Sequence, residues 1–230
     1  MSFVLKDWDE LPEELKTDAV RPYYDILKKK QGQLVLKRVF DAVGSLSLIL
    51  ILSPLMGGIA IWIRLDSEGP VIFKQERLTQ YGKRFNIFKF RTMVNNAQDI
   101  GSIAASEGDS RVTRVGEKIR AFRLDELPQL FNILSGDMSF VGPRPDLIER
   151  VRHYTDEMKA VYLVPAGVTS RASIAYKDEA KLLKDAEDVD AKYINEIMPA
   201  KMQINLKQIK AFSCLNDIKI MIDTVREVFG

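Results

Sequence analysis

The segment from Ala42 to Ile63 most constrains the fold of this chain, because it contains no charged residue. Its sequence, AVGSLSLILILSPLMGGIAIWI, is roughly long enough to span a bilayer as a helix. Ser53 and Pro54 lie in its middle, where proline removes a backbone hydrogen bond and bends a helix. The segment is therefore a plain transmembrane span, a buried core helix, or a helix that bends and returns to the same side.

Basic residues flank this segment at both ends. Lys28–Lys30 and Lys37–Arg38 precede it, and Trp62 and Arg64 close it. Because basic residues favour the cytoplasmic side, a pattern that is basic at both ends indicates no clear crossing. We therefore favour the re-entrant interpretation, in which the helix breaks at Ser53-Pro54. There a serine hydroxyl can satisfy the carbonyl that proline leaves free.

A second segment, from Ile119 to Pro145, contains two adjacent carboxylates, Asp125 and Glu126. Pro128 is tolerated only in the first turn of a helix, so we expect the helix to begin near Leu124 or Asp125. Ser135-Gly136 should end it. The spacing i, i+3, i+4, i+7 predicts a buried face made of Leu127, Leu130, Phe131 and Leu134.

Arginines surround the carboxylate pair: Arg120 and Arg123 lie upstream and Arg144 lies downstream. At the start of a helix Asp125 would lie among free N–H groups, a place that also suits phosphate. In the sequence Gly142-Pro143-Arg144-Pro145, two prolines restrict the backbone around one arginine, which indicates a cation held for an anion. The alternative is that Asp125 only caps the helix and the following glutamate is solvated.

Two short strands are predicted around a turn at Gly82, over residues 71–73 and 85–93. In the second strand a period of two places Lys89 and Arg91 on one face and Phe88 and Phe90 on the other. An apolar face against the core and a basic face toward a cleft would suit an anionic ligand. An ordinary half-exposed strand is the alternative.

Two later segments complete the expected elements. Residues 165–170 are expected to form a loop. An amphipathic helix is predicted near the end of the chain, with its apolar face made of Ile218, Met221, Ile222, Val225 and Phe229. This face either packs on the core, which we favour, or binds the membrane interface.

Composition excludes several classes of function. The 34 basic and 32 acidic residues leave a net charge of +2, so nucleic-acid binding is not expected. A single cysteine, Cys214, excludes an internal disulfide and a cysteine-rich metal site. The single histidine, His153, lies among charged residues and is expected at the surface, so a Ser/His/Asp triad or a histidine-rich metal site is not predicted.

Several longer motifs resemble the bacterial sugar transferases of the monotopic, small-type phosphoglycosyl transferase family. They occur in the same order over roughly residues 37 to 225. They are Lys37-Arg38 with Asp41, Ser53-Pro54, Gly69-Pro70-Val71, Phe73 to Arg77, Lys89 to Met93, Leu124 to Leu130, Gly136 to Pro145, and Asp217 to Ile220. The chain departs from the family pattern at residues 164–170, where an expected arginine is missing and an alanine is inserted.

The resemblance implies a reaction. Family members move a phosphosugar from a nucleotide-diphosphate sugar, by default a UDP-sugar, onto polyprenol (undecaprenyl) phosphate, and release UMP. It implies that Asp125 is the nucleophile that forms a covalent phosphosugar intermediate, with Glu126 beside it. It also implies that Mg²⁺ is required and contacts Asp125, and that Lys89, Arg120 and Arg144 bind phosphate. Arg91 shares the basic strand face with Lys89 and is a further phosphate-binding candidate.

The expected fold is of the α+β class and mainly helical. We expect an N-terminal cytosolic extension (1–36), a re-entrant membrane helix-break-helix (37–64), and a small cytosolic catalytic domain with a short β-hairpin and interfacial amphipathic helices (65–230). The extension either packs on the catalytic domain or mediates self-association. The resemblance places the protein at the cytosolic face of the bacterial inner membrane, in contact with lipid, as a monomer or homodimer. A catalytically silent membrane scaffold and a lipid-independent phosphatase are the rival interpretations.

Overall fold

The computed structural model describes residues 5–95, 97, 109–183 and 188–229, and most of them are helical. The helices are α1 (Arg21–Lys28), α2 (Gln31–Asp66), α4 (Arg114–Ala121), α5 (Gln129–Ser135), α6 (Ile148–Val151), α7 (Arg171–Ala175), α8 (Glu179–Leu183), α9 (Val189–Lys192), α10 (Met198–Lys210) and α11 (Cys214–Phe229). The strands are β1 (Ile72–Leu78), β2 (Arg84–Phe90), β3 (Met138–Val141) and β4 (Ala166–Thr169). A mainly helical fold with a short β-hairpin is thus confirmed.

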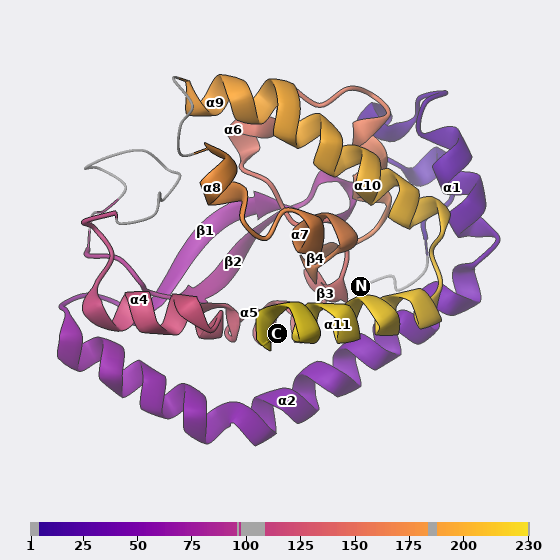
Figure 1. The fold of residues 1–230 in the computed structure, drawn as a ribbon. Helices are drawn as coiled ribbons and strands as arrows, with labels where there is room; N and C mark the ends of the chain where they lie inside the picture. Colours follow the sequence, from indigo (N-terminus) through magenta and orange to yellow (C-terminus); the bar gives the residue numbers. More distant parts are fainter. Residues whose placement is uncertain (1–4, 96, 98–108, 184–187, 230) are drawn as a thin grey trace.

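The uncharged segment lies within α2, which curves beneath the rest of the molecule with both ends rising on the same side (Figure 1). Pro54 lies inside the helix and cannot donate to the carbonyl of Leu50. The hydroxyl of Ser53 donates to that carbonyl oxygen at 2.9 Å. The predicted compensation of the proline by its neighbouring serine is confirmed.

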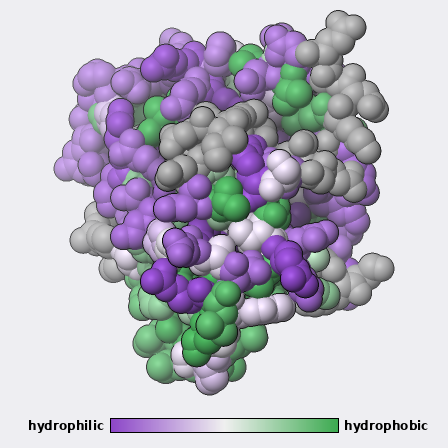
Figure 2. Space-filling view, turned by 90° about the vertical axis from the view of Figure 1, so that its left-hand side faces the viewer, coloured by the Kyte–Doolittle hydropathy of each residue, from purple (hydrophilic) through white to green (hydrophobic). Residues whose placement is uncertain are grey.

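By length and composition α2 could cross a membrane, and only 11% of its most apolar window is buried. The buried-core-helix interpretation is therefore wrong. Hydrophobic side chains gather at the lower end of the molecule, where α2 lies, while hydrophilic ones cover the part above (Figure 2). The exposed apolar residues of α2 include Val39, Val43, Leu46, Leu50, Ile51, Leu55, Ile61 and Leu65.

Both arms of α2 contact the same domain. Near its start, Lys37 forms a buried ion pair of 2.6 Å with Asp217 of α11. Arg38 donates to the carbonyl oxygens of the last two apolar residues of α5, Ile133 and Leu134. Near its end, Ile63 packs in a hydrophobic cluster shared with β2 and α4. The helix is thus fastened to one domain on both sides of Pro54.

Strands β1 and β2 form the antiparallel hairpin that the sequence predicts, with the turn at Gln80–Gly82. The predicted division of β2 into an apolar and a basic face is wrong. Phe85 and Ile87 lie on the same face as Lys89 and are buried against α5. The polar part of this face begins only at Lys89, because α5 covers the strand up to that point. Phe90, on the other face, packs against α4 and the end of α2.

Residues 166–169 form a strand, β4, that pairs in parallel with β3, so the expected loop at 165–170 is wrong. The pairing depends on two glycines that meet closely. A Cβ on Gly167 would lie 2.1 Å from the backbone nitrogen of Gly142. Beyond β3, Gly142 N–H donates to the carbonyl oxygen of Thr169 at 3.0 Å, and Gly167 N–H donates to that of Pro143 at 2.9 Å. This contact fixes the loop that carries Arg144.

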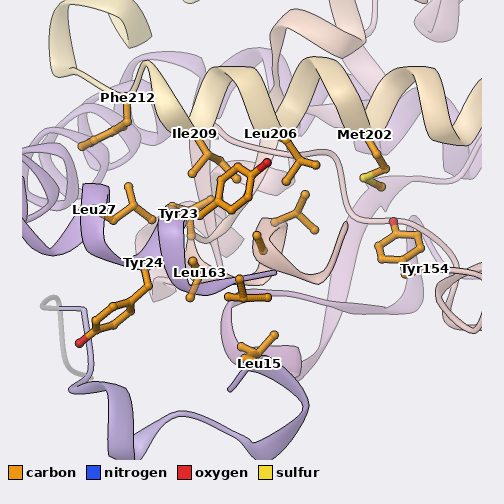
Figure 3. Close-up of a cluster of buried hydrophobic side chains, with 14 of the residues drawn as sticks. Leu15, Tyr23, Tyr24, Leu27, Tyr154, Leu163, Met202, Leu206, Ile209 and Phe212 are labelled. Carbon is orange, nitrogen blue, oxygen red and sulfur yellow. The ribbon is translucent and has the colours of Figure 1, made fainter. Parts of the chain in front are cut away.

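The N-terminal segment packs into a hydrophobic core with the last third of the chain (Figure 3). Leu15, Tyr23 and Leu27 contribute to this core from the N-terminal side, and Leu163 and Leu206 from the other side. The described residues that precede α2 therefore pack as a layer of the same domain, and the last six residues of the predicted 1–36 extension already belong to α2.

Helix α11 buries Ile220 but exposes Leu215, Ile218, Ile222 and Val225. Core packing of the predicted apolar face is therefore wrong for Ile218, Ile222 and Val225. The helix runs beside the first arm of α2 (Figure 1). Both elements carry exposed apolar side chains. We refer to the exposed apolar residues of α2 and α11 together as the apolar face.

Candidate active site

The carboxylate pair lies in a 3₁₀ turn, Leu124–Glu126, between α4 and α5. Arg123 has a φ of 53° and starts this turn in the left-handed conformation. The sequence predicted a helix that begins near Leu124 or Asp125. The α-helix itself begins at Gln129, so Asp125 is not the N-cap of α5. Gly136, with a φ of 88°, ends α5 at the predicted place.

The later start of α5 changes which of its residues are buried. Leu130 and Ile133 face the core, whereas Phe131 is 45% exposed and Leu134 is only partly buried. Asn132 is buried because its amide completes the edge of β2. Its Oδ1 accepts from Phe88 N–H at 2.9 Å, and its Nδ2 donates to the carbonyl oxygen of Asn86 at 2.8 Å. These two bonds hold β2 against the helix that follows the carboxylates.

Glu126 is held between two cations. Lys89 of β2 donates to its Oε1 at 3.0 Å, and Arg144 donates to the same oxygen at 2.5 Å. Burial would raise the pKa of Glu126, but Arg144 and Lys89 together hold it well below its usual range. Glu126 is therefore an ionised anchor that positions both cations.

Asp125 has the opposite environment. It is 9% exposed, and its carboxylate has no hydrogen bond or ion pair within the described chain. Burial raises the pKa of Asp125; the charge of Lys89 opposes this shift and the charge of Glu126 adds to it. An unpartnered, desolvated carboxylate is a stronger nucleophile and metal ligand than one already engaged by hydrogen bonds.

The structure brings together Lys89, Asp125, Glu126 and Arg144, and places Arg120 close enough to lower the pKa of Asp125. It does not bring Arg91 to this cluster. Arg91 lies beyond the end of β2, where it is buried and donates to the backbone carbonyls of Ser67 and Glu68. These bonds fix the connection between α2 and β1.

Two pockets meet at Arg144 and Ser173. The first, which we call the basic pocket, has a volume of about 360 Å³. Its cationic lining consists of Arg77, Arg120, Arg144, Arg150 and Lys201. The second, which we call the apolar groove, has a volume of about 610 Å³. It includes Glu126 and Gln129, and much of the rest of its wall is apolar, including Leu48, Leu130, Phe140, Val168 and Val225.

The sequence interpretation did not select three residues that these pockets contain. Arg77 closes the Phe73 to Arg77 motif, and its side chain enters the basic pocket. Asn205 and Gln129 are buried amides, and each has polar atoms without a hydrogen-bond partner within the described chain. The family resemblance could have indicated Arg77 and Gln129, which fall in quoted motifs, but no local pattern indicates Asn205.

A divalent cation fits this cluster only with help from a substrate. The described residues contain no group of three histidine, cysteine or acidic side chains able to hold a metal. Glu126 is already engaged by two cations, which leaves Asp125 as the free carboxylate. One or two carboxylates together with substrate phosphates is the usual protein environment of Mg²⁺. The chemistry of Asp125 is compatible with that ion.

A buried carboxylate among cations, between a basic pocket and an apolar groove, is the kind of site that handles phosphate groups beside a lipid. The chain belongs to the bacterial sugar transferase family, whose sequence profile matches residues 32–230. The predicted family is therefore confirmed.

Known relatives include the UDP-N-acetylgalactosamine-undecaprenyl-phosphate N-acetylgalactosaminephosphotransferase of Aeromonas hydrophila. It is 37% identical over 196 residues, which cover 84% of this chain and 43% of that protein. The UDP-glucose:undecaprenyl-phosphate glucose-1-phosphate transferase of Escherichia coli is 35% identical over 94% of this chain and 45% of that protein. The transferase of the same name from Caulobacter vibrioides is 37% identical over 82% of this chain and 68% of that protein. The chain thus spans less than half the length of the first two.

Proposed function

We propose that this protein transfers a sugar 1-phosphate from a nucleotide-diphosphate sugar, a UDP-sugar by family default, to undecaprenyl phosphate. The observation that carries the proposal is the buried Asp125, which has no hydrogen bond or ion pair within the described chain, beside an ionised Glu126 that holds Arg144 where a basic pocket and an apolar groove meet. The names of the relatives support the same reaction class.

The proposed reaction has two steps. In the first, a carboxylate oxygen of Asp125 attacks the sugar-side phosphorus of the donor, and the bond from that phosphorus to the bridging oxygen breaks. UMP leaves with the electron pair of that bond. In the second, a phosphate oxygen of undecaprenyl phosphate attacks the same phosphorus. The bond to Asp125 then breaks, which regenerates the carboxylate and leaves undecaprenyl-diphosphate sugar.

The surrounding side chains have separate roles in this proposal. Glu126 holds Lys89 and Arg144, and these two cations with Arg120 stabilise negative charge on the transferring phosphate. Mg²⁺, when bound through Asp125 and substrate phosphates, would neutralise charge on the phosphates. The unpartnered state of Asp125 leaves its oxygens free for these contacts.

The apolar groove is the proposed place of the lipid acceptor. Val225 belongs to both the groove and the apolar face, so the groove offers a polyprenol chain a largely apolar route from Glu126 toward that face. Leu48 of α2 forms part of the same wall and is exposed. A long apolar chain favours this route because each buried methylene contributes about 0.8 kcal/mol.

We further propose that α2 enters and leaves the membrane through the cytosolic leaflet of the bacterial inner membrane. The bend at Ser53-Pro54 and the attachment of both arms to one domain support this arrangement. Residues 37–64 would then form the re-entrant helix, and residues 65–230 a catalytic domain on the cytosolic face, where soluble nucleotide sugars occur. The exposed residues of α11 would lie in the interface.

The first test is the intact mass of the purified protein in detergent with Mg²⁺, mixed with a panel of UDP-sugars and no lipid. We expect an increase equal to one phosphosugar with the preferred donor, and none in Asp125→Asn. Asp137→Asn is the matched control, since Asp137 pairs with Lys83 outside the site and its loss should leave the adduct unchanged.

Two other outcomes separate the rival functions. UMP release that requires undecaprenyl phosphate, with no adduct from any sugar, would replace the covalent mechanism by direct transfer and make Asp125 a metal ligand. Phosphate release without lipid would indicate a phosphatase, and no turnover of any donor by a folded protein would indicate a scaffold.

A further inference from the structure

The basic pocket has more cations than partners. Lys201 pairs with Glu179 at 2.5 Å, and Arg150 lies 3.9 Å from Asp146 and stacks on the ring of Tyr193. Arg144 pairs with Glu126, as described above. Arg77 and Arg120 form no ion pair within the described chain, although both line this pocket.

Arg77 is the less expected of these two arginines. Its guanidinium donates to the neutral amide oxygen of Gln75 at 2.6 Å and to no carboxylate within the described residues. Burial and, to a smaller extent, the nearby charges of Arg144 and Arg150 lower its pKa to about 10 against the opposing charge of Asp146. A half-buried cation beside two others is unfavourable unless an anion joins them.

Asn205 of α10 provides an independent sign of a ligand. It is 4% exposed and lines the same pocket, yet its Oδ1 has no hydrogen-bond partner within the described chain. A buried acceptor left without a donor is unfavourable. A ligand hydroxyl or N–H group in the pocket would supply that donor.

We propose that the basic pocket binds the nucleoside-diphosphate half of the donor. Arg77 contacts the phosphate that departs with the nucleoside, and Asn205 accepts a hydrogen bond from a hydroxyl or N–H of the donor. The inference rests on the proposed function and adds two residues to it. The diphosphate of a nucleotide sugar carries two negative charges, which matches the two unpaired arginines of the pocket, Arg77 and Arg120.

The assignment gives Arg77 a role distinct from that of Arg120. Arg120 acts on the charge of Asp125 and so lies near the phosphorus that is attacked. Arg77 lines the same pocket, where the charges that act on it are those of Asp146, Arg144, Arg150 and Glu149. Negative charge that develops on the departing phosphate would be stabilised there.

The test is calorimetric binding of UMP, CMP, AMP, GMP and dTMP to the full chain in nanodiscs, with Mg²⁺. We expect the wild type to bind at least one of these nucleotides. Arg77→Gln should weaken that binding about tenfold or more, and Arg77→Lys by less, because charge is kept but the planar fork is lost. Arg84→Gln is the matched control, since Arg84 lies on the same hairpin, exposed and paired with Glu76.

Asn205→Leu is measured with the same nucleotide and with the preferred UDP-sugar. Weaker binding of both would assign Asn205 to the nucleoside half, and weaker binding of the UDP-sugar alone would assign it to the sugar. Unchanged binding of both would remove Asn205 from the assignment. Thermal unfolding of every variant separates loss of a contact from loss of the fold.

The inference fails if Arg77→Gln binds the nucleotide as tightly as the wild type, or if the wild type binds none of the five. The mass adduct on Asp125 is an independent measurement. An adduct with unchanged nucleotide binding in Arg77→Gln would overturn this inference and keep the proposed function. Nucleotide binding that depends on Arg77, without an adduct on Asp125, would keep this inference and overturn the covalent mechanism.

Discussion

The basic pocket and the apolar groove share Arg144 but satisfy charge in different ways. In the basic pocket cations outnumber their carboxylate partners, so the protein alone leaves positive charge uncompensated. In the groove, Glu126 and Arg144 compensate each other, and the wall beyond them is largely apolar. The first environment suits a soluble polyanion, and the second suits a phosphate at the end of a hydrocarbon chain.

The comparison explains why the pKa values of two adjacent carboxylates shift in opposite directions. Glu126 is fixed by two cations and remains ionised, which keeps Arg144 at the boundary between the pockets. Asp125 has no such partner and is available to whichever phosphate arrives. Glu126 thus holds Arg144 between the pockets, and in the proposed function Asp125 is the nucleophile.

Replacing Arg144 should have the largest effect, because it removes the wall that both pockets share. We expect Arg144→Ala to lower kcat/KM at least a hundredfold, as loss of a preorganised charge on a transferring phosphate does. It should also destabilise the protein by about 2–4 kcal/mol, because Glu126 keeps only Lys89 as a buried partner. Steady-state kinetics and urea unfolding measure both effects.

Arg152→Ala is the control for this variant, since Arg152 is exposed and lies outside both pockets. If Arg144→Ala lowered kcat/KM for only one of the two substrates, Arg144 would not serve both pockets.

Glu126→Gln removes the negative charge that pairs with Arg144 and Lys89. The pKa of Glu126 is depressed in the folded protein, so its ionised form contributes stability above the ordinary glutamate pKa of about 4.3. That stability is lost as pH falls through and below this range. We expect Glu126→Gln to unfold more easily at pH 7, by about 1–3 kcal/mol, and to lose part of the acid sensitivity of the wild type.

Unfolding free energies from pH 3 to pH 7 measure the difference. Parallel curves for wild type and variant would mean that the ionisation of Glu126 beside Lys89 and Arg144 contributes nothing to the pH dependence of stability.

Asp125 should show the opposite dependence on pH. Its folded pKa is raised, so the protonated form is favoured below the ordinary aspartate range, and this contribution is lost as pH rises through the raised pKa. Asp125→Asn should therefore be as stable as the wild type at pH 7, or more stable by up to about 1 kcal/mol. The rate of adduct formation should rise with pH through the same raised pKa.

Rapid-quench measurement of the adduct at several pH values tests this prediction. A rate whose midpoint lies at the ordinary aspartate pKa of about 3.9 would contradict it.

The smallest effect concerns the groove alone. Val225→Ser places a hydroxyl where the groove meets the apolar face, and we expect the KM for undecaprenyl phosphate to rise several-fold. The KM for the nucleotide sugar should not change. Leu215→Ser is the matched control, because Leu215 is 80% exposed on the same helix but does not line the groove.

Parts of this arrangement follow from the sequence because a single local rule determines them. The uncharged run predicts α2, and the missing N–H of Pro54 predicts the use of the hydroxyl of Ser53. The hairpin follows from two short apolar runs around Gly82. These features need no knowledge of what lies nearby in space.

Other parts depend on contacts between distant segments. The strand at 166–169 contains a glycine and is short, so it is recognised only by its pairing with β3. Lys89 and Arg91 share a face by period two, but the strand ends between them, and Arg91 turns to the backbone of Ser67. Phe131 is exposed because α5 begins later than predicted and buries Asn132 through bonds to β2. No local pattern contains that information.

The core shared by the first and last thirds of the chain has a consequence for biosynthesis. Tyr23 bonds with Glu157, a separation of 134 residues along the chain. At about 5–20 residues per second, a ribosome needs about 7–27 s to make that interval. During this time α2 emerges and can reach the bilayer, while Tyr23 and Leu27 still lack the partners that will bury them. Membrane attachment would then precede completion of the domain, so the nascent chain would finish folding at the surface where it works.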